Sequence, residues 1–196
     1  MRANPVGDAN VVFRLLVAAV SLVGFAVRVR GLEAKSLWFD EGLSVSVASR
    51  PIRELLGFLV SQDIHPPLHY VTLHGWMLLA GQAEFAVRFP ALLSGVGLVP
   101  ATYVLALALF GVERSRVPGE GAGAGVDGAR PLAAHLTALL AALLVALSPF
   151  LVYYSQEARM YGELALWSLL SSLALWKALD SLAPTAAVEE KPAEPE

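Results

Sequence analysis

Long apolar runs alternate with short polar segments along the chain. A helix needs about 20 mostly apolar residues to cross the hydrocarbon core of a membrane, and four runs reach this length or approach it. They cover residues 11–29, 86–111, 132–153 and 160–180, and each ends in charged residues, glycine or proline. The pattern predicts an all-α integral membrane protein, in which these runs form about four transmembrane helices of one domain, 11–182.

The segment between the first two runs carries shorter helical patterns. Residues 52–61 place apolar side chains at positions i, i+3, i+4 and i+7, which predicts an amphipathic helix lying on the membrane. These side chains are Ile52, Leu55, Leu56 and Leu59. Residues 41–49 and the apolar stretch 66–80, which is shorter than a span, are expected to form two more juxtamembrane helices.

The topology depends on whether the stretch 66–80 crosses the membrane. Short cytoplasmic loops favour Lys and Arg, and the Gly-rich loop 112–131 has 3 Arg in 20 residues against 4 basic residues in 56 for the loop 30–85. We therefore expect 66–80 to lie in the interface and 30–85 to be extracytoplasmic. The Gly-rich loop, the N-terminus (1–10) and the tail (183–196) are then cytoplasmic, and the glycine-rich part of the loop and the tail are expected to be disordered.

Composition narrows the class of protein further. Apolar residues make up 56% of the chain and charged residues 16%, against roughly 25% charged in ordinary soluble domains. This excludes a disordered or nucleic-acid-binding protein, and the net charge of -3 leaves no basic surface for a nucleic acid partner. The absence of cysteine excludes disulfides, thiolate metal sites and cysteine nucleophiles.

Asp40 and Glu41 follow two aromatic residues just outside the first span. One interpretation is structural: Asp40 caps a helix that begins at Glu41, and Glu41 complements the helix dipole. The other is catalytic, because a carboxylate next to lipid has its pKa raised toward the range useful for a general base. The local sequence leaves both open.

Arginines near the ends of the spans have two interpretations as well. Arg14 and Arg28 in the first span are expected to extend to the lipid headgroups. Arg88, at the start of the second span, either does the same while paired with Glu84 four residues earlier, or clamps a phosphate.

Two histidines occur at the beginning of the stretch 66–80. His65 and His69 share a face if a helix begins there, and such a pair can bind a metal ion, but no glutamate of an HExxH motif lies between them. For His69 an interfacial polar contact is the favoured interpretation, and for His65 the two are balanced.

The polar segment 148–161 interrupts the apolar sequence between the last two spans. An ordinary ion pair between Arg159 and Glu163 would explain part of it. A turn between spans does not require glutamine, glutamate, arginine and tyrosines together, however, and ionisable groups at the membrane usually have a function. The candidate functional side chains are Gln156, Glu157, Arg159 and Tyr161.

Taken in order, four strings resemble the N-terminal portion of the GT-C class of lipid-linked-sugar glycosyltransferases. They are SLWFDEGLS (36–44), HPPLHY (65–70), GQAEFAVRFPALLSG (81–95) and SPFLVYYSQEARMYG (148–162). The likeness is strongest to bacterial relatives of protein O-mannosyltransferases and aminoarabinose transferases, glycosyltransferase family 39. It covers about residues 11–180.

The resemblance implies an inverting enzyme of the bacterial plasma membrane that uses a polyprenyl-phosphate sugar at the extracytoplasmic face, with a hydroxyl of a lipid, glycan or protein as acceptor. It maps the family's essential carboxylate to Asp40, with Glu41 beside it. Arg88 and Arg159 become candidates for holding the lipid phosphate. The remaining candidates are Gln156 and Tyr161 for substrate, and Glu157 and His65 for a divalent metal ion or for orienting substrate.

Two departures from the family pattern matter. Ile64 and His65 stand where the aminoarabinose transferases have a glutamate before a Lys-Pro-Pro string, which weakens the case for a metal site. Family members also continue through further spans and a C-terminal domain. We therefore expect this chain to be an N-terminal catalytic part. The alternative is a non-catalytic membrane subunit, or a truncated remnant, that partners a full-length transferase.

Overall fold

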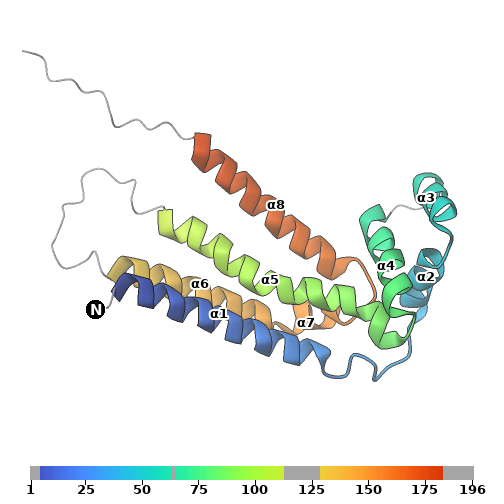
Figure 1. Ribbon diagram of the computed structural model, residues 1–196, viewed down its shortest axis with the longest axis horizontal. Helices are drawn as coiled ribbons and strands as arrows, with labels where there is room; N and C mark the ends of the chain where they lie inside the picture. Colours follow the sequence, from blue (N-terminus) through green and yellow to red (C-terminus); the bar gives the residue numbers. More distant parts are fainter. Residues whose placement is uncertain (1–4, 63–64, 113–128, 183–196) are drawn as a thin grey trace, which may run out of the picture.

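Four long helices lie side by side in the computed structural model, which describes residues 5–62, 65–112 and 129–182 (Figure 1). All regular elements in these ranges are α-helices. The long ones are α1 (Pro5–Val29), α5 (Glu84–Val112), α6 (Ala129–Leu147) and α8 (Tyr161–Leu182). The short ones are α2 (Phe39–Ala48), α3 (Ile52–Ser61), α4 (Pro67–Ala80) and α7 (Pro149–Ser155). The prediction of a helical protein is confirmed.

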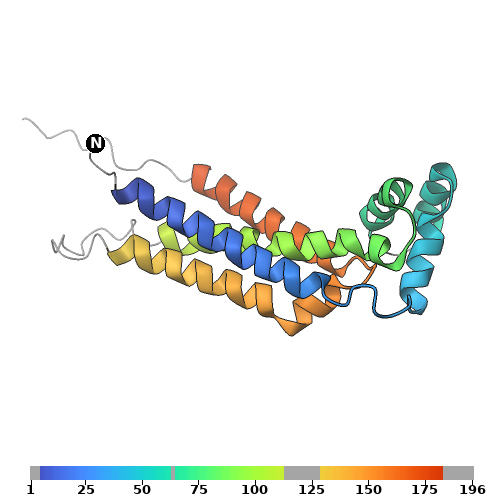
Figure 2. The ribbon, with the colours of Figure 1, turned by 60° about the horizontal axis from the view of Figure 1, so that its bottom comes forward.

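The helices α2, α3 and α4 gather at one end of the long bundle, and α7 lies at the same end (Figures 1 and 2). The beginning of α1 and the far ends of α5 and α8 lie at the opposite end. Helix α4 does not cross the length of the bundle. The connection between α1 and α5, residues 30–83, therefore lies at the same end as residues 148–160. The side of the membrane that this end faces stays a prediction.

Two helices are long and apolar enough to cross a membrane, Val11–Val29 of α1 and Glu84–Gly111 of α5. A third span exists if α6 and α7, which are bent by 55° from one another, count as one. The fourth predicted span corresponds to α8, which is not among the candidates and carries Glu163, Lys177 and Asp180. Two to three helices are therefore long and apolar enough to span a membrane, and the predicted count of four is not confirmed.

The run 132–153 is not one continuous helix, contrary to the sequence prediction. Helix α6 ends at Leu147 and α7 begins at Pro149, which lacks the N–H that would continue the helical hydrogen bonds. The hydroxyl of Ser148 accepts a hydrogen bond from the Leu151 amide at 3.4 Å and so begins the new helix. This break leaves the last carbonyls of α6 without partners from the next turn.

Arg28 supplies those partners. Its guanidinium donates to the carbonyls of Ala146 at 2.8 Å and Val145 at 3.1 Å, and to the Ser155 hydroxyl at 3.3 Å. The side chain is completely buried. The expectation that Arg28 extends to the headgroups was therefore wrong, because the broken α6 offers it acceptors inside the protein. The pairing also places a cation at the negative end of the α6 dipole.

The core between α1, α5 and α6 is built around small residues. Ala138, Ala142 and Ala146 recur at every fourth position of α6 and are fully buried. They contact larger side chains of the other two helices, Phe13, Val17, Val99 and Tyr103 among them. Small residues at such spacing let helix backbones approach closely inside a membrane.

The predicted amphipathic helix 52–61 has the bounds of α3, and the other two juxtamembrane helices correspond to α2 and α4. Leu55 and Leu59 are buried in a cluster with Val47 and Tyr70. Ile52 and Leu56 remain about half exposed. Only one half of the apolar face is therefore used by the protein interior.

Gly95 of α5 lies where Arg28 and Ser155 meet, and its substitution by Ala is expected to lower the free energy of unfolding by about 1–3 kcal/mol. A Cβ there would overlap the Ser155 hydroxyl and lie 3.0 Å from Arg28 Nε. Gly75→Ala in α4 is the control, since nothing lies within 4 Å of the added methyl. It should stabilise by up to about 1 kcal/mol through helix propensity. Thermal unfolding in detergent measures both, and equal melting temperatures would contradict the close packing.

Candidate functional site

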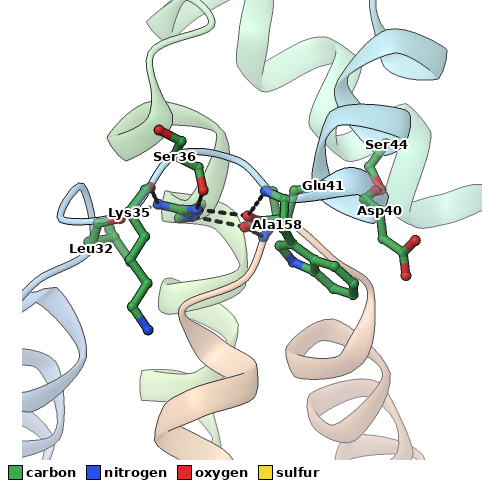
Figure 3. Close-up of polar contacts among 9 residues, drawn as sticks. Leu32, Lys35, Ser36, Asp40, Glu41, Ser44 and Ala158 are labelled. Carbon is green, nitrogen blue, oxygen red and sulfur yellow. Dashed lines mark hydrogen bonds and ion pairs between the residues drawn. The ribbon is translucent and has the colours of Figure 1, made fainter.

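A carboxylate and a guanidinium form the centre of the polar end of the bundle (Figure 3). Glu41 of α2 is 1% exposed and accepts hydrogen bonds from Arg88 Nε at 2.8 Å and from Arg88 Nη2 at 2.7 Å. The Ala158 amide, between α7 and α8, donates to the same carboxylate at 2.8 Å. We call this cluster of Glu41, Arg88 and Ala158 the Glu41–Arg88 knot. It ties together α2, α5 and the α7–α8 connection.

Arg88 uses every N–H group within the protein. Besides its two bonds to Glu41, Nη1 donates to the carbonyls of Leu32 at 2.7 Å and Lys35 at 2.8 Å, and Nη2 donates to the Ser36 carbonyl at 3.3 Å. These contacts account for all five donors of a guanidinium. The interpretation that pairs Arg88 with Glu84 was wrong, since its partner is Glu41. A lipid phosphate could bind Arg88 only by displacing one of these acceptors.

The hydrogen bonds decide the ionisation state of Glu41. Burial alone would raise the pKa of this carboxyl, but the hydrogen bonds from Arg88 and from the Ala158 amide outweigh it and hold the pKa below the ordinary value. The Trp38 amide adds a bond to Glu41 at 3.3 Å. Glu41 is thus charged near neutral pH, and its two oxygens are already engaged in hydrogen bonds.

Asp40 lies beside the knot, but its side chain points away from it (Figure 3). Its side chain is 35% exposed, and its Oδ2 lies 3.9 Å from Arg159 Nη2. Helix α2 begins at Phe39, so the interpretation of Asp40 as the cap of a helix beginning at Glu41 was wrong. The reciprocal contact at this helix start is made by Glu41, which leaves the Asp40 carboxylate available.

Arg159 is held against α2 from the other side. Its Nη1 donates to the Ser44 hydroxyl at 3.2 Å and to the Asp40 carbonyl at 3.4 Å, and the residue is 5% exposed. The pairing of Arg159 with Glu163 that helical spacing suggested does not occur. Glu163 instead lies 3.4 Å from His69 Nδ1, and both side chains are buried. His69 is therefore an interior residue and not an interfacial contact.

A pocket of about 380 Å³ opens next to the knot, and Asp40 is not among its lining residues. Its walls come from the loop after α1, from α2, α5 and α7, and from the connection after α7. The lining residues are Gly31, Leu32, Lys35, Ser36, Trp38, Glu41, Arg88, Tyr153, Gln156 and Glu157. Of the predicted site residues the pocket therefore contains Glu41, Arg88, Gln156 and Glu157.

Gln156 and Glu157 have distinct roles in the pocket wall. The Gln156 amide donates to the carbonyls of Arg28 at 2.9 Å and Arg30 at 3.0 Å, so it closes the end of α1. Glu157 is buried and hydrogen-bonded to Tyr153. Burial and the nearby charge of Glu41 raise the pKa of Glu157, against the opposing influence of Tyr153 and Arg159.

The raised pKa of Glu157 predicts a pH effect on stability. The folded protein holds this proton more tightly than the unfolded chain, so stability falls as pH rises from the ordinary pKa of 4.5 through the folded value. Glu157→Gln keeps the neutral form and should therefore raise the melting temperature near neutral pH and remove this part of the pH dependence. Melting temperatures measured from about pH 4.5 to neutral pH test this prediction, with the exposed Glu54→Gln as the control. If the two variants had the same pH dependence, the raised pKa of Glu157 would be contradicted.

His65 and Tyr161 lie outside the pocket. The His65 ring stacks edge-on against Tyr70, with ring centroids 6.5 Å apart. The Tyr161 ring packs against Tyr154, with centroids 4.9 Å apart, and its centroid lies 5.8 Å from the Arg159 guanidinium carbon.

The predicted metal ligands do not form a metal site with the side chains around them. In the ranges that the structure describes, no three His, Asp or Glu side chains are grouped so that they could hold a metal ion. Glu157 is hydrogen-bonded to Tyr153, and His65 stacks on Tyr70. A divalent metal ion at Glu157 and His65 therefore stays a prediction.

A second hollow of about 470 Å³ runs between α5, α7 and α8 and is mostly apolar. Its lining includes Leu98, Phe150, Tyr154, Tyr161, Leu164 and Ala165. Tyr161 therefore joins this groove to Arg159 and, through it, to Asp40.

Sequence reasoning missed Lys35, Ser44 and the partnership of His69 with Glu163. Lys35 had a signal, because it is a lone lysine just before the SLWFDEG string in a segment with few basic residues. Ser44 and the His69–Glu163 pair had no such signal, because their roles depend on contacts between distant helices.

Comparisons with protein-family models, curated proteins and solved structures found no significant match to this chain.

Proposed function

We propose that this chain is the N-terminal catalytic part of an inverting membrane glycosyltransferase of the GT-C class. In this proposal α1, α5, α6 with α7, and α8 are four spans, and the polar end faces the extracytoplasmic side of a bacterial plasma membrane. The donor is a polyprenyl-phosphate sugar. The acceptor is a hydroxyl group of a lipid, glycan or protein.

The observation that carries the proposal is the meeting of motifs that are far apart in sequence. The SLWFDEGLS, GQAEFAVRFPALLSG and SPFLVYYSQEARMYG strings contribute Glu41, Arg88 and Ala158 to one hydrogen-bonded knot. The HPPLHY string joins the same end through His69, which lies against Glu163. A bundle of helices needs no such buried charged cluster for stability alone, and ionisable groups at membrane level favour a functional role.

Asp40 is the base in the proposed reaction. Its carboxylate takes the proton from the acceptor hydroxyl as that oxygen attacks the anomeric carbon of the sugar. The bond from this carbon to the phosphate oxygen breaks, and the electron pair leaves with the polyprenyl phosphate. The sugar is thereby transferred with inversion. A positioned base contributes about 10²–10⁴-fold to such a reaction, and the remainder comes from orientation of the substrates.

The apolar groove between α5, α7 and α8 supports a lipid-linked substrate. It lies along the candidate spans and ends near Tyr161, whose ring is 5.8 Å from the Arg159 guanidinium carbon. A hydrocarbon chain in this groove would lead toward the polar end of the bundle, where Tyr161 begins α8. Tyr161 would then contact the substrate from the groove side.

The experiment is transfer of labelled sugar from a mixed pool of polyprenyl-phosphate donors, in membranes that contain the chain. Transfer that requires the chain, and that is lost in Asp40→Asn, is the expected result. Absence of transfer in both, together with stable co-purification of a larger transferase, would overturn the proposal in favour of a non-catalytic subunit.

A further inference from the structure

The cations near the proposed reaction differ in how free they are. Arg88 has all five donors bound within the protein. Arg159 is 5% exposed and contacts Ser44 and Asp40. Lys35 is exposed, and its ammonium group makes no hydrogen bond or ion pair with the residues that the structure describes. It is the one pocket-lining cation within these ranges that can accept a new anionic partner without losing one.

The backbone of Lys35 is nevertheless fixed. Its carbonyl accepts from Arg88 Nη1 at 2.8 Å, and the neighbouring Ser36 carbonyl accepts from Nη2 at 3.3 Å. The knot therefore positions the loop, while the lysine side chain is exposed at the pocket. A fixed base with a free ammonium group is suited to binding an anion from solution or from the membrane surface.

The pocket presents little competition for this ammonium group. Arg88 neutralises Glu41 through the bidentate pair. Glu157 is buried and hydrogen-bonded to Tyr153, whereas Lys35 lies on the exposed side. Two aromatic side chains, Trp38 and Tyr153, complete the wall and offer apolar surface next to the charge.

Lys35 and Asp40 flank the knot on opposite sides, and both side chains extend in the direction of the long helices (Figure 3). The pocket lysine and the proposed base are therefore separate side chains, and each can be substituted without changing the other.

We propose that the pocket next to the Glu41–Arg88 knot binds a phosphate group at the membrane surface, and that Lys35 is the side chain that holds its charge. This inference rests on the proposed function, because it names the place where the donor phosphate is bound and released. The same chemistry would also accept free phosphate. Lys35, rather than Arg88, is then the phosphate ligand of the reaction.

The test measures binding to the purified chain in lipid nanodiscs. The probes are a polyprenyl phosphate in the bilayer and inorganic phosphate in solution. Lys35→Gln removes the charge from an exposed side chain and leaves every hydrogen bond of the knot in place. The matched control is Lys177→Gln, which removes an exposed lysine of α8 toward the opposite end of the bundle.

Lys35→Gln is expected to weaken binding of the polyprenyl phosphate about tenfold or more, which is the size of one charge-assisted hydrogen bond. Lys177→Gln should leave the affinity unchanged. Tight binding of inorganic phosphate that is lost in Lys35→Gln would identify free phosphate as the ligand and support the pocket assignment. Equal affinity of both variants and the wild type for both probes would overturn the inference.

Sugar transfer tests the proposed function, and phosphate binding tests the pocket, so the two can fail independently. Lys35-dependent binding without any sugar transfer would keep the phosphate site and remove the transferase. Sugar transfer that is lost in Asp40→Asn but unaffected by Lys35→Gln would keep the transferase and remove the phosphate site.

Discussion

Asp40→Asn is expected to lower sugar transfer about 10²–10⁴-fold while the fold stays intact. Asparagine keeps the size of the side chain but cannot accept the acceptor proton. The Asp40 side chain is 35% exposed, and its ion pair with Arg159 is long, at 3.9 Å. Loss of an exposed contact of this kind costs no more than about 1 kcal/mol. Initial rates of transfer and melting temperature, measured on the same preparation, check the two parts of the prediction.

The matched control for this prediction is Glu54→Gln. Glu54 lies on α3, at the same end of the molecule, and its side chain is exposed. Glu54→Gln removes one negative charge, as Asp40→Asn does, so any effect of net charge on binding at the membrane appears in both variants. If Glu54→Gln lost as much transfer as Asp40→Asn, the assignment of Asp40 as the base would fail.

Helix positions could be predicted from sequence to within a few residues in several cases. The amphipathic helix 52–61 and the first span, 11–29, coincide with structural elements because their apolar spacing and flanking charges are local signals. The break at Ser148 also has a local signal, because Pro149 follows it directly. The prediction missed this break because the sequence is apolar on both sides of it. The fourth predicted span, α8, is not among the helices that length and composition mark as candidates, because charged residues interrupt its apolar sequence.

The partners of charged residues were the part that local spacing predicted wrongly. Arg88 was matched with Glu84 and Arg159 with Glu163, because helical neighbours are what a sequence shows. The structure pairs Arg88 with Glu41, which is 47 positions away, and Glu163 with His69. Long-range pairs of this kind depend on how the α2–α4 helices fold back over the bundle. Arg28 is similar, since its acceptors appear only when α6 is broken.

Predicting which polar strings lie close together was more successful than predicting the contacts of each side chain. The strings around Asp40, Arg88 and Glu157 do meet at one end of the bundle. At that end, Glu41 and Arg88 are hydrogen-bonded to each other. The side chains of Asp40 and Lys35 remain accessible to a substrate. The polar strings indicate where charge accumulates, and the three-dimensional contacts decide which charges are left for a substrate.

The Glu41–Arg88 knot should be the most sensitive point for stability. Glu41→Ala is expected to lower the free energy of unfolding by about 3–5 kcal/mol, because it leaves the buried Arg88 charge without its counter-ion. It also removes the acceptor of the Ala158 amide, which lies at 2.8 Å. Thermal or denaturant unfolding in detergent measures the loss.

The control is a double-mutant cycle with Arg88→Ala. Arg88→Ala alone should be as costly, because it strands the Glu41 carboxylate and frees the carbonyls of Leu32, Lys35 and Ser36. The double variant should then lose less than the two losses combined, by roughly 0.5–3 kcal/mol, since neither charge is left unpaired. Strictly additive losses would mean that the two side chains act independently.

The stability of the protein at acid pH is a second measurement. Because the pKa of Glu41 is lowered in the folded protein, its contribution to stability is present above about pH 4.5 and is lost as the pH falls through the pKa of the folded state. That acid-induced loss should be smaller in Glu41→Ala.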